Sequence, residues 1–182
     1  TYDIGPDSTP ETILAAMVDR WEQAAEDADL EAKAEELGYT PAELMTVASL
    51  VEAEGRGDDM PKVARVIYNR LEGDETNGLL QIDATVNYAA DQDLGAVPTT
   101  EDLEIDSPYN TYQNPGLPPT PIEAPGDAAI DAAAHPADGD WYYYVTVNLR
   151  TGETKFAETY DEFLGYKDEL REYCETESQG AC

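Results

Sequence analysis

The sequence has few basic residues, few cysteines and no long apolar run, and each shortage argues against a class of protein. Ten Lys and Arg stand against 40 Asp and Glu among 182 residues, so the net charge is −30 with the single His neutral. Repulsion at this charge argues against nucleic acid or an anionic membrane surface as the main partner. No stretch approaches the roughly 20 apolar residues of a membrane-spanning helix. We therefore expect a folded domain with a solvated acidic surface.

Cysteine and histidine chemistry is equally scarce. Cys174 and Cys182 stand close together near the C-terminus, where they could form a local disulfide in an oxidising compartment or remain free thiols. No histidine accompanies them, so they do not resemble a zinc site. A Ser-His-Asp triad would need His135, and no GxSxG segment supplies its serine. Phosphate-binding glycine loops and EF-hand spacing are absent too, and we predict no metal and no cofactor.

Helical signals dominate the first 71 residues. The apolar spacing predicts helices at about 10–37, 42–54 and 60–71. Gly38 is expected to end the first of them. Thr40 and Glu43 form a capping box at the start of the second. The first half of the chain is therefore predicted to be a helical core.

The second half changes character. Residues 73–126 are rich in Pro, Gly, Asn and Tyr, and we predict ordered loops with short strands there. After them come a short helix, a β-hairpin and an amphipathic helix, at about 126–134, 141–159 and 160–173. Helices followed by strands and a further helix favour an α+β fold.

With 40 acidic residues, only position can single out a carboxylate. Glu52 and Glu54 border the apolar stripe of the second predicted helix, on opposite flanks and near its C-terminal end. Partial burial and the negative end of the helix dipole raise the pKa of a glutamate in such a place, which suits it to donate a proton near neutral pH. Alternatively, both side chains flank the core and face water, or one pairs with Arg56 or Arg65.

Residues 107–112, Ser-Pro-Tyr-Asn-Thr-Tyr, suggest a ligand for such an acid. Tyrosine rings stack on sugars, and amide and hydroxyl groups match sugar hydroxyls and acetamides. Gln81 and Asp83 add further polar groups. Together these residues predict a polysaccharide site. The alternative is an ordinary turn whose tyrosines fill the core.

Six motifs in order give residues 40–160 a specific resemblance. They are ASLVEAE at 48–54, KVARVIYNRL at 62–71, LQIDAT at 80–85, SPYNTY at 107–112, GLPPTPI at 116–122 and AAAHP at 132–136. The sequence resembles the MltG/YceG-like endolytic murein transglycosylases. This resemblance implies a lysozyme- or lytic-transglycosylase-like helical core with Pro- and Gly-rich ordered loops, a C-terminal hairpin and a closing helix. It also implies cleavage inside peptidoglycan glycan strands.

The resemblance implies roles for particular residues. Glu52, the first glutamate of the AS-x-x-E-x-E motif, is expected to be the single general acid and base that cleaves the MurNAc–GlcNAc bond and forms a 1,6-anhydro end. Residues expected to bind substrate or support the site are Glu54, Gln81, Asp83, Thr85, Tyr109, Asn110, Thr111 and Tyr112. Two alternatives remain: a muramidase-type hydrolase in which Asp83 or Glu54 activates water, and a non-catalytic peptidoglycan-binding module.

The resemblance also suggests that the chain is the catalytic portion of a longer protein. We expect an N-terminal helical segment (1–38) packing on a catalytic domain (39–173), with a polar tail (174–182). An N-terminal membrane helix would anchor the full-length protein in the cell membrane, with the catalytic domain extracytoplasmic. The expected partners are peptidoglycan strands and penicillin-binding synthases, and nucleic acid is not expected.

Overall fold

The computed structural model describes residues 2, 4–90 and 98–178 of the chain. These residues form seven α-helices and one two-stranded antiparallel sheet, so the α+β prediction is confirmed. The elements are α1 (Pro10–Asp27), α2 (Leu30–Leu37), α3 (Pro41–Glu54), α4 (Met60–Glu72), α5 (Asp83–Ala90), α6 (Asp127–Ala134), β1 (Tyr143–Asn148), β2 (Glu153–Ala157) and α7 (Tyr160–Thr176). Short 3₁₀ turns lie at Gly57–Asp59 and Asp102–Glu104.

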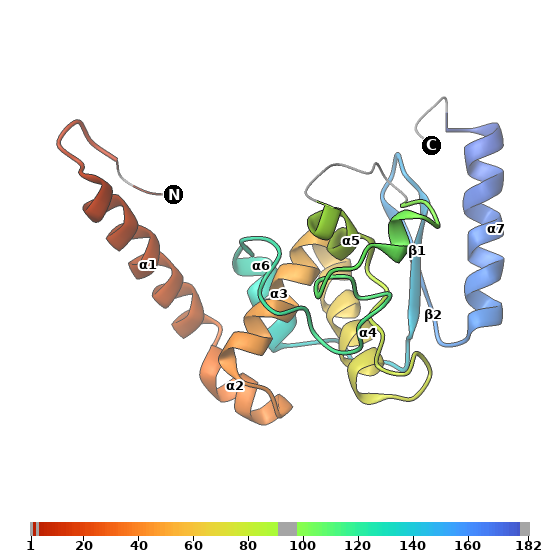
Figure 1. Ribbon diagram of the computed structural model, residues 1–182, viewed down its shortest axis with the longest axis horizontal. Coiled ribbons are helices and arrows are strands. Elements are labelled where there is room, and N and C mark those ends of the chain that lie inside the picture. Colours follow the sequence, from red (N-terminus) through yellow and green to blue (C-terminus); the bar gives the residue numbers. More distant parts are fainter. Residues whose placement is uncertain (1, 3, 91–97, 179–182) are drawn as a thin grey trace.

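The first two helices lie at one end of the molecule, and α1 projects away from the rest (Figure 1). Its apolar residues Leu14, Val18 and Trp21 are exposed, whereas α2 packs on α3 and α6. The sequence predicts one continuous helix here because no Gly or Pro interrupts the pattern. This prediction is wrong at Asp29, whose φ of 53° lies in the left-handed region and separates the two helices.

Helix α3 is the centre of the fold. The predicted capping box is present: Oγ1 of Thr40 accepts the Glu43 N–H, and the Glu43 carboxylate accepts the Thr40 N–H. Helix α4 and the alanine-rich helix α6 pack against α3 (Figure 1). The buried residues of α3 are Leu44, Thr46, Val47, Ala48, Ser49, Leu50 and Val51. Burial of this middle section fixes the direction in which the last turn presents its side chains.

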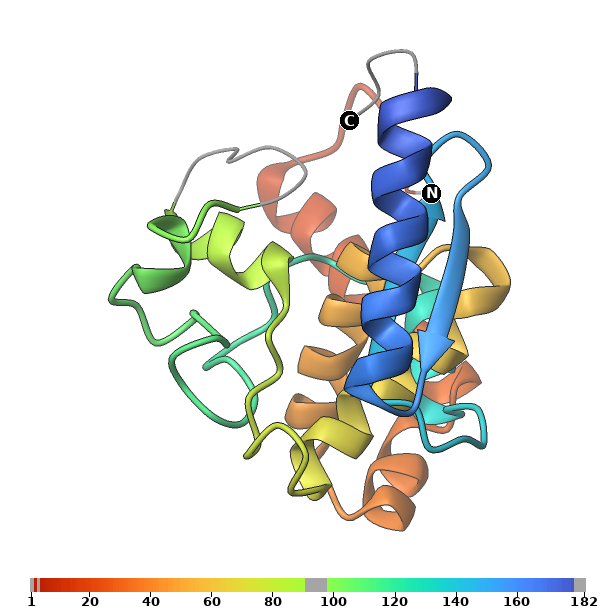
Figure 2. The same cartoon turned by 90° about the vertical axis from the view of Figure 1, so that its right-hand side faces the viewer.

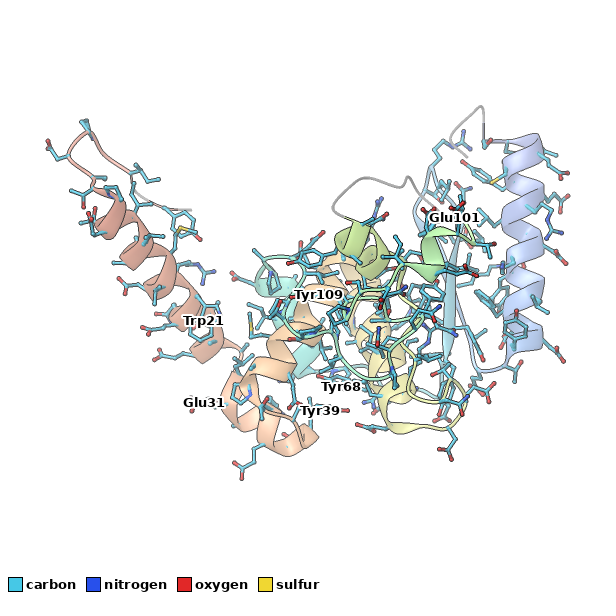
Figure 3. All side chains as sticks on the ribbon, viewed as in Figure 1. Trp21, Glu31, Tyr39, Tyr68, Glu101 and Tyr109 are labelled. Atoms are coloured by element: carbon cyan, nitrogen blue, oxygen red, sulfur yellow. The ribbon has the colours of Figure 1, made fainter. Side chains whose placement is uncertain are left out.

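Two tyrosines connect the helices that surround α3. The rings of Tyr39, just before α3, and Tyr68 of α4 lie 5.2 Å apart (Figure 3). The Tyr68 hydroxyl donates a hydrogen bond to the Ala133 carbonyl of α6 at 2.9 Å. Tyr68 is therefore satisfied in the core, as a buried tyrosine must be.

The C-terminal part matches its prediction. Strand β1 pairs with β2 in an antiparallel register that places Tyr143 opposite Ala157. Helix α7 runs along the hairpin (Figure 2), where the Tyr143 ring stacks on Phe163 at 5.3 Å. Strand β1 also contacts α4. The hairpin is thus held between α7 and the helical core.

Residues 73–126 depart from their prediction. The described part of this stretch contains no strand and instead holds helix α5 and a 3₁₀ turn. The loop at 107–116 is fixed to residues 78–82, because the Gln81 N–H donates to the Thr111 carbonyl at 3.1 Å and the Gly116 N–H donates to the Gly78 carbonyl at 2.8 Å. Backbone hydrogen bonds therefore order this stretch without forming a sheet.

Some predictions concern residues beyond those described. Cys174 lies in α7, while Cys182 lies outside the described residues, so their pairing stays a prediction. The division at residues 38 and 173 also stays a prediction. Within the described ranges, no helix is long and apolar enough to cross a membrane.

Candidate active site

Glu52 and Glu54 leave the end of α3 in different directions. Residues two positions apart in an α-helix are separated by about 200° around its axis. Glu54 therefore faces α5 and the hairpin, and Glu52 faces the loop that precedes α6. The structure thus separates the two glutamates that the sequence places together.

The carboxylate of Glu54 is held from two sides. Its Oε1 accepts the N–H of Ala84, at the start of α5, at 3.2 Å. Its Oε2 accepts the hydroxyl hydrogen of Tyr144, from β1, at 3.0 Å. The residue as a whole is half-buried, but the carboxyl end is enclosed by these two elements. Its orientation is therefore set by segments 30 and 90 residues away in the chain.

The surroundings raise the pKa of Glu54 above its ordinary value. Burial is the main cause, because it disfavours the charged form, and the nearby Asp83 acts in the same direction. The hydrogen bonds from Ala84 and Tyr144 and the charge of Arg70 oppose the shift. Glu54 thus keeps its proton more readily than an exposed glutamate and still has groups that stabilise its carboxylate.

Glu54 lines an open cavity of about 450 Å³. One wall comes from the region between α3 and α4, another from the start of α5, and a third from the hairpin and its turn. The other lining residues are Ala53, Gly55, Arg56, Asp59, Val63, Asp83, Ala84, Asn87, Thr146, Leu149, Gly152 and Thr154. A carboxyl with a raised pKa that lines a cavity is a candidate for acid catalysis.

Glu52 is not among the residues that line this cavity. Its Oε2 accepts the N–H of Gly126 at 3.0 Å, and Gly126 is the N-cap residue of α6. A carboxylate at a helix N-terminus is favoured by the helix dipole. The contact shown for Glu52 is therefore one that joins α3 to α6.

The LQ-x-D residues have unequal surroundings. Asp83 begins α5 and lines the cavity, and its Oδ1 accepts the Tyr112 hydroxyl hydrogen at 2.6 Å. Thr85 is fully buried, and its hydroxyl lies 2.8 Å from that of Thr111. Gln81 has an exposed side chain and a φ of 51°. Of these three predicted site residues, only Asp83 lines the cavity with Glu54.

The tyrosine- and asparagine-rich loop mostly supports the site from behind. Asn110 is fully buried, and its amide donates to the carbonyls of Leu103 and Ile105 at 3.0 and 2.9 Å. Thr111 is buried and accepts the Ile82 N–H at 3.0 Å. Groups so enclosed are unable to reach a sugar, so their role is to shape the backbone.

The two tyrosines of this loop differ. Tyr112 bonds to Asp83 and therefore reaches the neighbourhood of Glu54. Tyr109 instead contacts the ring of Tyr88 at 4.8 Å, and its hydroxyl lies 2.8 Å from that of Thr120. Figure 3 shows Tyr109 beside α5. The structure therefore connects Tyr112, but not Tyr109, to the acid.

Sequence reasoning missed Tyr144 and Arg70 as site residues. Tyr144 was predicted only as part of a strand, and a strand gives no sign of which tyrosine reaches a carboxylate. Arg70 carried a signal, because it follows Ile67 by three residues on the apolar stripe of α4 and is buried there. A cation on a buried face points to a specific partner.

His135 is not among the residues that line this cavity. His135 is the C-cap residue of α6, and its Nδ1 lies 3.1 Å from Oδ1 of Asp131, in agreement with a structural role at a helix end. No group of three or more metal-binding side chains occurs in the part of the chain that the structure describes.

The sequence profile of the YceG-like family matches residues 1–169, and the chain belongs to that family. The chain is 39% identical to the endolytic murein transglycosylase of Bacillus subtilis (strain 168) over 158 residues, which cover 86% of this chain and 42% of that protein. It is 32% identical to the endolytic murein transglycosylase of Streptococcus pneumoniae (strain D39) over 170 residues, covering 89% of this chain and 29% of that protein.

A solved structure shares the fold. The YceG-like protein of Listeria monocytogenes is 34% identical, with a TM-score of 0.78 over 91% of this chain and 52% of that one. The chain spans less than half the length of the curated relatives that it matches. The resemblance found in the sequence is thus confirmed at the level of the family.

Proposed function

We propose that this chain carries the catalytic site of an endolytic peptidoglycan lytic transglycosylase. Two relatives that are at least 32% identical bear the name endolytic murein transglycosylase. The observation that carries the proposal is Glu54, an enclosed carboxyl with a raised pKa in a polar cavity. The substrate is the MurNAc–GlcNAc β-1,4 bond inside a glycan strand, and the product is a 1,6-anhydro-MurNAc end.

The acid in this proposal is Glu54 and not Glu52. The sequence does not distinguish them, because both flank the same stripe at a helix end. Glu54 has the enclosed carboxyl, the raised pKa and a place in the cavity wall, whereas Glu52 bonds to the start of α6. A general acid must reach the oxygen that it protonates, and Glu54 meets that requirement.

The reaction needs only one carboxyl group. Protonated Glu54 gives its proton to the glycosidic oxygen, and the bond from this oxygen to C1 of MurNAc breaks. The 6-hydroxyl of the same MurNAc attacks C1, and its proton passes to the Glu54 carboxylate. The attacking group is already part of the sugar, so proximity supplies much of the rate. The hydrogen bonds from Ala84 and Tyr144 stabilise the carboxylate that exists between the two proton transfers.

A hydrolase remains the second candidate because Asp83 lines the same cavity. In that mechanism Asp83 would activate a water molecule while Glu54 protonates the leaving oxygen. Asp83 already accepts the Tyr112 hydroxyl hydrogen at its Oδ1, at 2.6 Å, so this oxygen is occupied by a protein donor. Mass spectrometry of digested glycan strands separates the two reactions: anhydro ends support the transglycosylase, and reducing ends that have gained water support the hydrolase.

The residue assignment is tested by a matched pair of variants, Glu54→Gln and Glu52→Gln. Both changes replace a carboxyl group on the same helix by an amide of nearly the same size. We expect E54Q to lose at least about a hundredfold in cleavage rate and E52Q to retain most of it, with purified strands as substrate. Loss in E52Q with retention in E54Q would return the role to Glu52. A wild-type protein that binds strands without cutting them would indicate a binding module.

We place the activity outside the cytoplasm, where peptidoglycan lies. Anchoring by an N-terminal membrane helix and association with penicillin-binding synthases belong to the full-length protein and stay predictions. Cell fractionation and co-purification with the full-length protein test both.

A further inference from the structure

Arg70 is a buried cation beside the proposed acid. It lies on α4 and is 7% exposed. Its Nε donates a hydrogen bond to the Tyr142 carbonyl at 2.6 Å, and its Nη1 donates to the Leu80 carbonyl. In the described part of the chain, no carboxylate forms an ion pair with it. Backbone carbonyls thus anchor Arg70, and its charge is not neutralised by a direct contact.

The same guanidinium lies against the tyrosine that holds Glu54. Its centre is 5.9 Å from the ring of Tyr144 and 5.7 Å from that of Tyr143, distances at which a cation is attracted to an aromatic face. The Tyr144 hydroxyl in turn donates to Glu54. Burial keeps the pKa of Tyr144 well above its usual value, so this hydroxyl remains a donor. Arg70, Tyr144 and Glu54 therefore form one connected series.

We propose that Arg70 is a positioning residue for this site: it supplies the permanent positive charge that lets Glu54 pass through its carboxylate form, and it holds Tyr144 in place. This inference rests on the proposed function of Glu54. A buried acid that only resisted ionisation would give up its proton poorly. A fixed cation nearby lowers the cost of the carboxylate. Because Arg70 is bound to carbonyls, it stays available when Glu54 is neutral.

Other groups act on Glu54 as well. Asp83 opposes ionisation, and Tyr112 and Tyr144 surround it from the loop and from β1. Across the cavity lie two further charged residues, Arg56 and Asp59. Asp59 pairs with Lys62 at 3.2 Å, and Arg56 is exposed to water, which weakens its influence. Arg70 is therefore the cation with the strongest expected effect.

The test separates charge from hydrogen bonding. Arg70→Gln keeps amide donors and removes the charge, while Arg70→Lys keeps the charge and removes the planar donor group. Arg65→Gln is the matched control, because Arg65 lies on the same helix and donates to a backbone carbonyl, that of Ala137, at 2.6 Å. The pKa of Glu54 is measured by NMR on protein labelled with ¹³C in glutamate carboxyls, with E54Q identifying the signal.

We expect R70Q to raise the pKa of Glu54, to move the alkaline limb of the rate profile to higher pH and to lower the plateau rate below that limb by about tenfold. R70K and R65Q should leave the pKa near its wild-type value. If circular dichroism shows R70Q to be unfolded, Arg70→Met, which keeps the packing against the two rings, replaces it. An unchanged pKa in the folded variant, or an equal rise in R65Q, would overturn the inference. A rise in pKa together with full activity of E54Q would instead overturn the proposed function.

Discussion

The hydroxyl of Tyr144 donates a hydrogen bond to Oε2 of Glu54 at 3.0 Å and joins the hairpin to the end of α3. Neither a motif nor a charge pattern in the sequence marked Tyr144. It turns a glutamate at a helix end into an enclosed carboxyl. The properties of the proposed acid therefore depend on a residue of the C-terminal hairpin.

Tyr144→Phe removes this hydrogen bond and leaves the ring in place. The bond stabilises the carboxylate, so its loss raises the pKa of Glu54 further and moves the alkaline limb of the cleavage rate to higher pH. We expect the plateau rate, measured at pH values where Glu54 is protonated in both proteins, to fall by about tenfold, the effect of losing a charge-assisted hydrogen bond of roughly 1.5 kcal/mol. The measurement is the pH dependence of strand cleavage.

The control for this change is Tyr166→Phe. The Tyr166 hydroxyl donates to the Glu162 carboxylate at 2.8 Å on the exposed surface of α7, so the same type of bond is removed away from the cavity. Its pH profile should match that of the wild type. Equal profiles for all three proteins would show that Tyr144 has no influence on the acid.

Glu54 should make the folded protein less stable as pH rises. Its folded pKa lies above the ordinary value of 4.5, so the folded state holds the proton to a higher pH than the unfolded chain does. The free energy of unfolding therefore falls as pH rises from about 4.5 through the raised pKa. Below about pH 4.5 the carboxyl is protonated in both states, so this loss of stability does not occur.

Glu54→Gln has no such ionisation. We expect it to be more stable than the wild type at pH 7 and the difference to disappear at acid pH. Urea unfolding of both proteins across this pH range measures the difference. A difference in the free energy of unfolding that does not change with pH would contradict the assignment of a raised pKa to Glu54.

Asn110 should matter for stability more than for chemistry. Its amide donates to two loop carbonyls, and its Oδ1 accepts the Tyr112 N–H at 3.0 Å. Asn110→Ala leaves these buried partners unsatisfied, and we expect a loss of about 2–4 kcal/mol in the free energy of unfolding. Denaturant unfolding gives the value.

Asn114→Ala is the matched control. The Asn114 amide also donates to two carbonyls, those of Ser107 and Asn110, but from an exposed position. Water replaces the lost amide there, so the expected loss is below about 1 kcal/mol. Similar losses in the two variants would show that burial of Asn110 has no particular importance.

Local chemistry allowed much of the fold to be predicted from the sequence. The capping box of Thr40 and Glu43 involves residues three apart, and Gly38 ends α2 through its own φ of 82°. Helix α5 escaped prediction because it has only eight residues and includes the β-branched Thr85 and Val86. Short elements of this kind are decided by distant contacts, such as the one from Ala84 to Glu54.

Helical spacing alone could not decide between Glu52 and Glu54, because the choice depends on contacts with distant parts of the chain. Helical geometry places both on the flanks of one stripe, but it contains no information on which flank another element will cover. Strand β1 and helix α5 cover Glu54, and the loop before α6 meets Glu52. The motifs therefore located the proposed site to within one turn of α3, and the packing around Glu54 is what favours it as the acid in our proposal.

Glu54 meets its partner Tyr144 late in synthesis, because Tyr144 lies 90 residues further along the chain. During synthesis, α3 leaves the ribosome well before β1, so the glutamate first meets bulk water and behaves as an ordinary acid. A nascent or prematurely terminated chain that ends before the hairpin lacks the Tyr144 hydroxyl that bonds the Glu54 carboxyl. The carboxyl of Glu54 is therefore enclosed only after the hairpin, residues 143–157, has been synthesised and has packed against the end of α3.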